Sequence, residues 1–323
     1  MTMNSKLMKF SAVVCMAIAL VLTTSCGTKT ITGDTPLEVE TPSAQFLGDF
    51  KVLSWNVQDG MWADQYDNYN HFVAYVNEIN PDVFCIQEAA SHFDEDSGTL
   101  SHSKRYLPHN RQKNDKNQNP DGWIALAERW GHPYVVMGYY LDNYPVVITS
   151  KYPIELVKRL GDYDGVDVSH GAIHVKIHFT ENYYVNFVNL HLNPHDVNNR
   201  FAEVAYYLSY TINSEKYYTE KNWLMMGDFN NSVQSPLCQE IRKNSYIDLW
   251  AEMNNYTYDS RIDFIYGTDA MRKALKACYM PMDFARQEHI LTSVNGVALN
   301  SGHGLWKYSD HYPVVAEFSL YEE

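Results

Sequence analysis

The chain has 323 residues, with 39 acidic residues against 25 lysines and arginines, so its formal net charge is −14. Hydrophobic residues make up 45% and aromatic residues 14% of the sequence, which excludes a disordered or low-complexity chain and allows a large apolar core. The acidic balance also argues against a partner held mainly by attraction to a phosphate backbone, because that mode of binding needs a basic face.

The N-terminus has the features of a secretory signal. Lys6 and Lys9 precede an apolar run from Phe10 to Leu22, which is too short to span a membrane comfortably. The ending Leu22-Thr-Thr-Ser-Cys26-Gly resembles a bacterial lipoprotein box, in which Cys26 would be the lipidated first residue of the mature chain. A plain cleaved signal and an uncleaved anchor are the alternatives. Residues 1–25 are therefore expected to form a lipoprotein signal peptide and residues 26–48, which are rich in Thr, Pro and Gly, a tether.

A lipid anchor would place the protein in the bacterial cell envelope, attached to a membrane and outside the cytoplasm. Loss of residues 1–25 removes two lysines and no acidic residue, which changes the net charge to −16. No repeat or linker follows the tether, so residues 49–323 are expected to form a single domain, and a monomer is expected. The cysteines of this part, Cys85, Cys238 and Cys278, form no disulfide framework, although a Cys238–Cys278 bridge stays open.

Short β-type runs alternate with helical segments along the domain. Apolar runs and alternation predict strands at 51–57, 83–86, 144–150, 170–179, 183–190, 223–226, 261–266 and 312–320. Helical spacing and capping residues predict helices at 67–80, 196–213 and 235–243. Two polar stretches, 91–121 and 287–308, are expected to be long loops, which in a compact domain are usually functional or disordered.

Polar residues stand where most of these strands end. They are Asn56 after the first strand, Gln87-Glu88 after the second, His191, Asp228 with Asn230, and Asp310-His311 before the last strand. If the last strand runs antiparallel to the others, its start lies at the edge where they end. We therefore expect these side chains to gather at one edge of a β-core, where binding and catalytic sites are commonly built.

Asp263 differs because it lies inside the predicted strand Arg261-Ile-Asp-Phe-Ile. Strand alternation would put Asp263 and Arg261 on one face, so a structural ion pair between them is one interpretation. The functional interpretation is that Asp263 accepts a hydrogen bond from His311 and fixes the tautomer of the imidazole, as the acid of a catalytic triad does.

The ordered set of these motifs resembles the endonuclease/exonuclease/phosphatase superfamily, which includes pancreatic-type deoxyribonucleases, abasic-site endonucleases, bacterial sphingomyelinases and inositol polyphosphate phosphatases. The segment from Asn143 to Ile154 is similar to a strand common in that group. The match covers residues 50–318. It implies an α/β fold of the DNase-I type, a four-layered sandwich of two packed mixed β-sheets flanked by helices.

The resemblance also implies a divalent metal, usually Mg²⁺ with Mn²⁺ as a substitute, and hydrolysis of a phosphoester by in-line attack of water. Hard cations prefer carboxylate and amide oxygens. Glu88 is the first choice as metal ligand, followed by Asp310 and by Asn56, the last acting directly or through a water.

Five residues are assigned catalytic roles by the resemblance. His311, oriented by Asp263, would be a general base or an electrostatic clamp on the phosphate. Asp228 would position or deprotonate the attacking water, and which of Asp228 and His311 is the base stays open. Asn230 would hold the water or a phosphate oxygen, and His191 would donate to a non-bridging oxygen. Substrate binding is thus expected from Asn56, His191 and Asn230, with His170 and His109 as weaker candidates for phosphate contact.

The substrate is expected to be a small-molecule or lipid phosphodiester. An extracytoplasmic nuclease for DNA or RNA is the second hypothesis, disfavoured by the negative charge, although the stretch 91–121 carries five lysines and arginines among its acidic residues. A protein that binds a phosphate ligand without turnover is the third. Trp62, Trp123, Trp306 and Tyr308 are aromatic residues expected near the rim of the site, where they could stack on a ligand or simply pack.

Overall fold

The computed structural model describes residues 44–58, 60–61, 69–89, 121–138, 145–161, 170–255, 260–281, 293–294, 297–298 and 309–322. Ser43–Glu323 form one compact unit. The predicted signal peptide, Cys26 and most of the predicted tether lie outside the described residues. The tether was expected to extend to residue 48, but the first strand already begins at Gln45. Among the described residues, no helix is long and apolar enough to cross a membrane.

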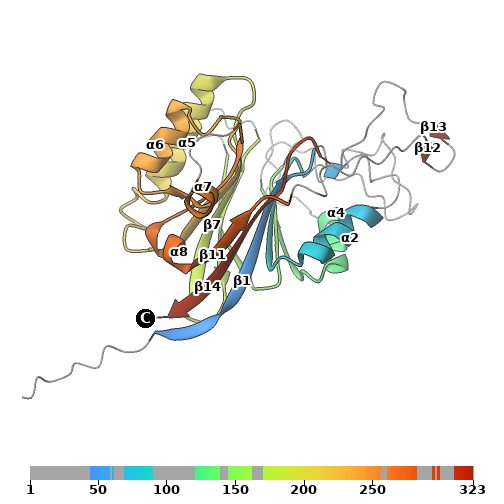
Figure 1. Ribbon diagram of the computed structural model, residues 1–323, viewed down its shortest axis with the longest axis horizontal. Coiled ribbons are helices and arrows are strands. Elements are labelled where there is room, and N and C mark those ends of the chain that lie inside the picture. The colour runs from blue at the N-terminus through green and yellow to red at the C-terminus, as the bar shows by residue number, and fades with distance from the viewer. Residues whose placement is uncertain are drawn as a thin grey trace, which may run out of the picture. The chain divides into compact units, whose positions relative to one another are not determined.

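Two mixed sheets, each of six strands, make up the body of this unit (Figure 1). The first sheet has the order β11 (Leu275–Tyr279), β14 (Val314–Glu322), β1 (Gln45–Asn56), β2 (Val83–Gln87), β4 (Val147–Ser150), β3 (Tyr134–Met137). The second has the order β5 (Ile154–Leu160), β6 (Ala172–His178), β7 (Tyr184–His191), β8 (Trp223–Asp228), β10 (Asp263–Gly267), β9 (Ile247–Asp248). β14 is antiparallel to β1, which confirms that the last strand starts at the edge where β1 ends.

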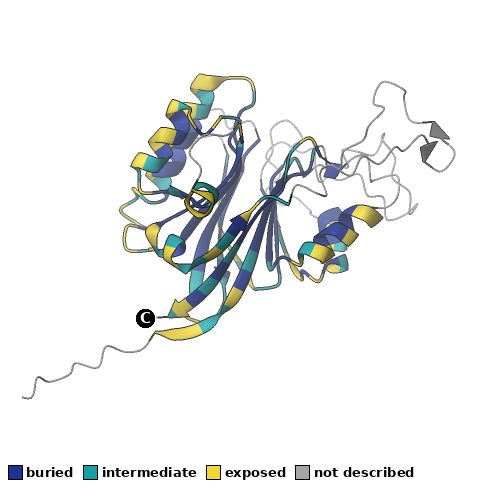
Figure 2. Cartoon of the chain, in the orientation of Figure 1, coloured by how far each residue is buried: buried dark blue, intermediate teal, exposed yellow. Residues whose placement is uncertain are grey.

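Helices cover the outer faces of both sheets. α2 (Asn70–Ile79) and α4 (Asp121–Arg129) pack on β1, β2 and β4, and α5 (Val197–Tyr210) and α6 (Pro236–Lys243) pack on β7, β8 and β10. α7 (Leu249–Asn254) and α8 (Asp269–Ala274) contact strands of both sheets. The helices turn buried faces inward and exposed faces outward (Figure 2). Helix, sheet, sheet and helix are the four predicted layers, so the predicted fold is confirmed.

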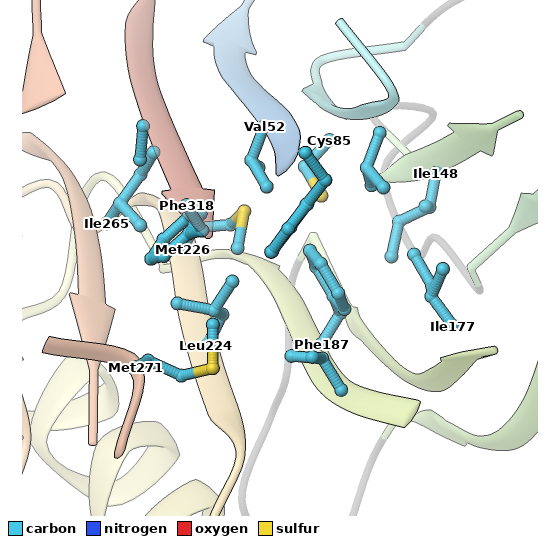
Figure 3. Packing of buried hydrophobic residues seen from close by; sticks show 14 of the residues in the cluster. Val52, Cys85, Ile148, Ile177, Phe187, Leu224, Met226, Ile265, Met271 and Phe318 are labelled. Atoms are coloured by element: carbon cyan, nitrogen blue, oxygen red, sulfur yellow. The ribbon is translucent and has the colours of Figure 1, made fainter. Parts of the chain in front are cut away.

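Strand alternation divides the apolar side chains into three layers. Inward-facing residues of the two sheets meet in one central core, and the side chains between the helices and each sheet form two outer cores. Figure 3 shows the central core, with Val52, Cys85, Ile148 and Phe318 from the first sheet and Ile177, Phe187, Leu224, Met226 and Ile265 from the second. This close-packed core supports the side chains at the edge where β1, β2, β7 and β8 end and β14 begins.

Several elements were not predicted from the sequence. β5 and β11 are edge strands in which charged and exposed residues interrupt the apolar pattern, as is usual where a strand has only one neighbour. α4 begins at Asp121, the last residue of the stretch expected to be a loop. The expected strand at 261–266 begins only at Asp263, so Arg261 lies before it. Cys85, Cys238 and Cys278 are buried and free, and no bridge joins the last two.

Candidate active site

The apolar core between the sheets ends in a layer of buried polar side chains. Ser54, Gln87 and Asn189 occupy inward-facing positions near the ends of β1, β2 and β7. The Gln87 amide nitrogen donates to Asn189 Oδ1 at 2.6 Å and lies 3.4 Å from Ser54 Oγ. The Asn189 amide nitrogen donates to the carbonyl groups of Ile86 and Val147. These bonds join the two sheets, so the strand ends above them are held in a fixed relation.

Asn56, at the end of β1 and two residues beyond Ser54, bridges two of the predicted acidic residues. Its amide nitrogen donates to Glu88 Oε1 and to Asp228 Oδ2, each at 3.0 Å, and its amide oxygen accepts the backbone N–H of Gln58. Glu88 follows β2 in the first sheet, whereas Asp228 ends β8 in the second. Carboxylates from separate sheets therefore meet at one amide group.

The backbone around these carboxylates adopts conformations that few residues tolerate. Glu88 and Asn230 lie in the left-handed region, with φ of 53° and 49°. Gly227, directly before Asp228, has a φ of 137°, and a Cβ there would collide with the carbonyl oxygen of Leu190. Glycine is thus required for β8 to approach β7 closely just before the site. Unusual backbone conformations are concentrated where functional side chains are placed.

His311 lies between carboxylates. Its Nδ1 atom is 2.7 Å from Asp263 Oδ2, and its Nε2 atom is 3.7 Å from Asp228 Oδ2. Arg261 pairs instead with the buried Asp248, at 2.8 Å. The predicted hydrogen bond between Asp263 and His311 is therefore confirmed, and the alternative pair with Arg261 is not formed.

The segment that carries His311 is fastened to the end of β1. Ser309 Oγ donates to the carbonyl oxygen of Asn56 at 2.6 Å and accepts the backbone N–H of His311. The indole N–H of Trp55 donates to the carbonyl oxygen of His311 at 3.0 Å. The imidazole is thus positioned through its main chain as well as through Asp263.

His191 reaches the same carboxylate from β7. Its Nε2 atom is 3.5 Å from Asp228 Oδ2, so three nitrogen-bearing side chains surround one oxygen atom: Asn56, His191 and His311. The His191 ring stacks on the ring of His170, with centroids 4.2 Å apart. His170, which the sequence suggested as a weaker candidate for phosphate contact, therefore lies next to the site.

Asn230 and Asp310 complete the set of predicted residues. The backbone N–H of Asn230 donates to Asp228 Oδ1 at 2.8 Å, and its amide nitrogen donates to the carbonyl oxygen of Leu192. Asp310 Oδ1 is 3.7 Å from His311 Nε2, and this side chain is 61% exposed. Asp310 is close enough to Glu88 to raise the pKa of that carboxyl group. All eight predicted residues of the domain are thus linked by direct contacts or by charge.

Burial shifts the protonation equilibria of the site. Desolvation raises the pKa of Glu88, against the hydrogen bond from Asn56. Desolvation raises the pKa of Asp228 to about 7, and the charge of Asp263 acts in the same direction. For His311 burial lowers the pKa, but the surrounding carboxylates outweigh it and raise the pKa to about 10. Burial holds the pKa of His191 well below its usual value, so this imidazole is neutral.

The donor set fits a divalent cation. Four carboxylates stand at this edge with one charged imidazole; burial raises the pKa of both Glu88 and Asp228, and a neighbouring carboxylate adds to the rise in each case. Oxygen or nitrogen atoms of Asp228, Asp263 and His311 lie within 4.8 Å of one another. One buried oxygen of Asp263, Oδ1, has no hydrogen-bond partner among the described residues. Carboxylate oxygens in such a group are ligands that hard cations prefer.

Some predicted contributors fall outside the described residues: His109, Trp62, Trp306, Tyr308 and the lysines and arginines of 91–121. Trp123, which is described, lies on the buried face of α4 in the outer core of the first sheet and donates to the carbonyl oxygen of Ala89. Sequence reasoning passed over Ser54 and Asn189. A polar residue at an inward-facing position of an apolar strand is the signal that could have found both.

Comparison with known proteins gives the family. The sequence profile of the Endonuclease/Exonuclease/phosphatase family matches residues 53–311, which include every site residue described above. The chain belongs to this family. Its members are metal-dependent phosphoester hydrolases. No curated protein sequence matches the chain.

Solved structures of the family share the fold. A family protein from Bacteroides thetaiotaomicron is 16% identical, with a TM-score of 0.55 over 86% of this chain and 97% of that chain. A 3′-5′ exonuclease from Neisseria meningitidis is 17% identical, with a TM-score of 0.55 over 84% and 100%. An AP endonuclease from Archaeoglobus fulgidus is 16% identical, with a TM-score of 0.54 over 84% and 100%. Identities this low establish the architecture and leave the substrate of this chain undefined.

Proposed function

We propose that the protein hydrolyses a phosphodiester by in-line attack of water, with Mg²⁺ or Mn²⁺ as cofactor. The observation that carries this proposal is the convergence on Asp228 Oδ2 of Asn56, His191 and His311, which come from three separate chain segments. A buried carboxylate surrounded by donors is suited to holding a water molecule in one orientation.

Glu88 and Asp310 would hold the metal, and Asn56 would take part from its place between Glu88 and Asp228. When bound, the metal supplies Lewis-acid stabilisation of charge on the phosphoryl and leaving oxygens. The protein's own contribution is to hold Glu88 and Asp310, which flank strands of the first sheet, next to Asp228 at the end of β8 in the second. The Asn56 bridge restrains Glu88 and Asp228 and leaves one oxygen of each outside that bridge.

Asp228 and His311 would divide the remaining chemistry. His311 has carboxylate oxygens of Asp263 at 2.7 Å and Asp228 at 3.7 Å, so the imidazolium form is favoured and cannot accept a proton from water. We assign it the role of a cationic clamp on a phosphate oxygen. Asp228 then orients the attacking water and accepts its proton. Neutral His191 and the amide of Asn230 would contribute hydrogen bonds to phosphate oxygens as negative charge develops.

A small-molecule or lipid substrate is supported by the net charge of −14 and by the predicted lipid anchor at Cys26. The anchor would keep the enzyme at a membrane of the bacterial envelope, as a monomer, close to phospholipid headgroups or scavenged organic phosphates. A nuclease is the second candidate, because the similar folds include an AP endonuclease and a 3′-5′ exonuclease. The acidic chain gives little support for binding a polyanion.

The test is a metal-supplemented screen of phosphodiesters, phospholipids, sugar phosphates and plasmid DNA. Release of nitrophenol from bis(p-nitrophenyl) phosphate should require Mg²⁺ or Mn²⁺, should stop in excess EDTA and should resume when metal is restored. Glu88→Ala and His311→Ala variants should fold, by circular dichroism, and lose about 10²-fold or more of the turnover. Full activity in excess chelator would exclude the proposed metal chemistry, and efficient nicking of plasmid DNA with no other substrate would favour the nuclease.

A further inference from the structure

A cavity of about 760 Å³ adjoins the site, and Asp263, Asp310 and His311 form part of its wall. Its size is in the range typical of small-molecule sites. The rest of the wall comes from α7, the segment before β10, the end of β11 and the residue after His311. The contacts made by these residues indicate what the cavity can receive.

Apolar and aromatic side chains dominate this remaining wall: Trp250, Ile262, Tyr279, Met280 and Tyr312. Each of them is partly exposed, so each has surface that a ligand could cover. The Tyr279 hydroxyl is already engaged, since it donates to Glu317 Oε1 at 3.1 Å. A ligand in the cavity would therefore meet mainly ring faces and aliphatic groups.

The charge of the described wall is unfavourable for a second anion. Arg261 is the one lysine or arginine among the described lining residues, and both terminal nitrogens of its guanidinium face the buried Asp248, at 2.8 and 3.4 Å. The same guanidinium lies over the Trp250 ring, 4.1 Å from the centroid. Asp263 and Asp310 add negative charge at the end next to the catalytic histidine. Among the described lining residues, a second phosphate would thus meet carboxylates and no uncommitted lysine or arginine.

We propose that this cavity binds the uncharged, largely apolar organic group of a phosphodiester whose only charge is the scissile phosphate. The inference rests on the proposed function and narrows its substrate class. It places the phosphate at His311 and the ester group against Trp250 and Tyr279. A polynucleotide or a polyphosphorylated ligand would not suit this wall.

Two ligands test the proposal: diphenyl phosphate, which offers an aromatic group on either side of the phosphate, and dimethyl phosphate, which offers none. Calorimetry with the full chain and Mn²⁺ should show diphenyl phosphate binding about tenfold or more tightly, because a buried ring removes a large apolar area from water. Ser260→Trp, at an exposed position on the cavity wall, should fill part of the cavity. It should therefore weaken the binding of diphenyl phosphate about tenfold and leave the affinity for dimethyl phosphate unchanged. Thr219→Trp is the matched control, since Thr219 is also exposed and precedes β8 at the end opposite Asp228.

The outcomes separate the two proposals. Equal affinity for both ligands, or equal weakening of both by Ser260→Trp, would overturn the cavity assignment while hydrolysis of bis(p-nitrophenyl) phosphate continued. Tighter binding of a thymidine oligonucleotide than of diphenyl phosphate would overturn it as well. Failure of the wild-type protein to hydrolyse any phosphodiester with added metal would instead reject the proposed function itself.

Discussion

Replacement of Asp263 by Asn removes one charge and keeps the shape of the side chain. The carboxylate accepts a charge-assisted hydrogen bond from His311 Nδ1 at 2.7 Å, and such bonds contribute about 1.5–3 kcal/mol. If the bond orients and charges His311 in the transition state, its loss lowers kcat by about 10- to 100-fold. KM should change little, because Asp263 would act on the substrate only through the imidazole.

The assay is steady-state hydrolysis of bis(p-nitrophenyl) phosphate, combined with proton NMR of the His311 ring. The wild-type Nδ1 proton, held by a carboxylate, should resonate far downfield, and this signal should be lost in Asp263→Asn. Asp82→Asn is the control, since Asp82 also accepts hydrogen bonds but precedes β2 at the end opposite Glu88. A variant with kcat within twofold of wild type would refute the role of Asp263, whatever its effect on stability.

Three further predictions concern stability. Gly227→Ala should lower the free energy of unfolding by about 2 kcal/mol or more, because φ is 137° and the new Cβ has no space; an unchanged Tm would contradict this. Burial lowers the pKa of His132 to about 4, so neutral His132 contributes fully to the free energy of unfolding above about pH 6.5, and this contribution is lost as pH falls toward 4. In urea titrations, His132→Gln should therefore reduce the acid-induced loss of stability by up to about 3 kcal/mol. Asp248→Ala should lower the free energy of unfolding by about 3–5 kcal/mol because Arg261 stays buried, whereas Asp269→Ala, in an exposed pair, should leave it nearly unchanged; equal losses of stability in the two variants would contradict this.

The sequence predicted the part of the fold that depends on regular burial. Residues 223–226 are apolar on both faces because β8 lies between two cores, and such a run can be recognised in the sequence alone. β5 could not be found in the same way, since it is an edge strand with exposed Glu155 and Lys158. Strand pairing at an edge depends on the neighbouring strand more than on local hydrophobicity.

The candidate site was predictable because its residues stand at strand ends in a fixed order. Most of the contacts that these residues make with one another could not be predicted from the sequence. That Asn56 joins Glu88 to Asp228 follows from the packing of one sheet on the other, which no local pattern encodes. His170 was one of two weaker candidates for phosphate contact, and its stacking on His191, which places it beside the site, could not be read from the sequence.

The most direct test of the central claim is a crystal grown with Mn²⁺ and measured for anomalous scattering. The claim is that scattered carboxylates and histidines form one cation-binding centre between the two sheets. A single strong peak, or a close pair, bounded by the carboxylates of Glu88 and Asp310 is the predicted result. A protein that shows no peak at this edge, or binds its Mn²⁺ elsewhere while hydrolysing phosphodiesters at full rate, would contradict it.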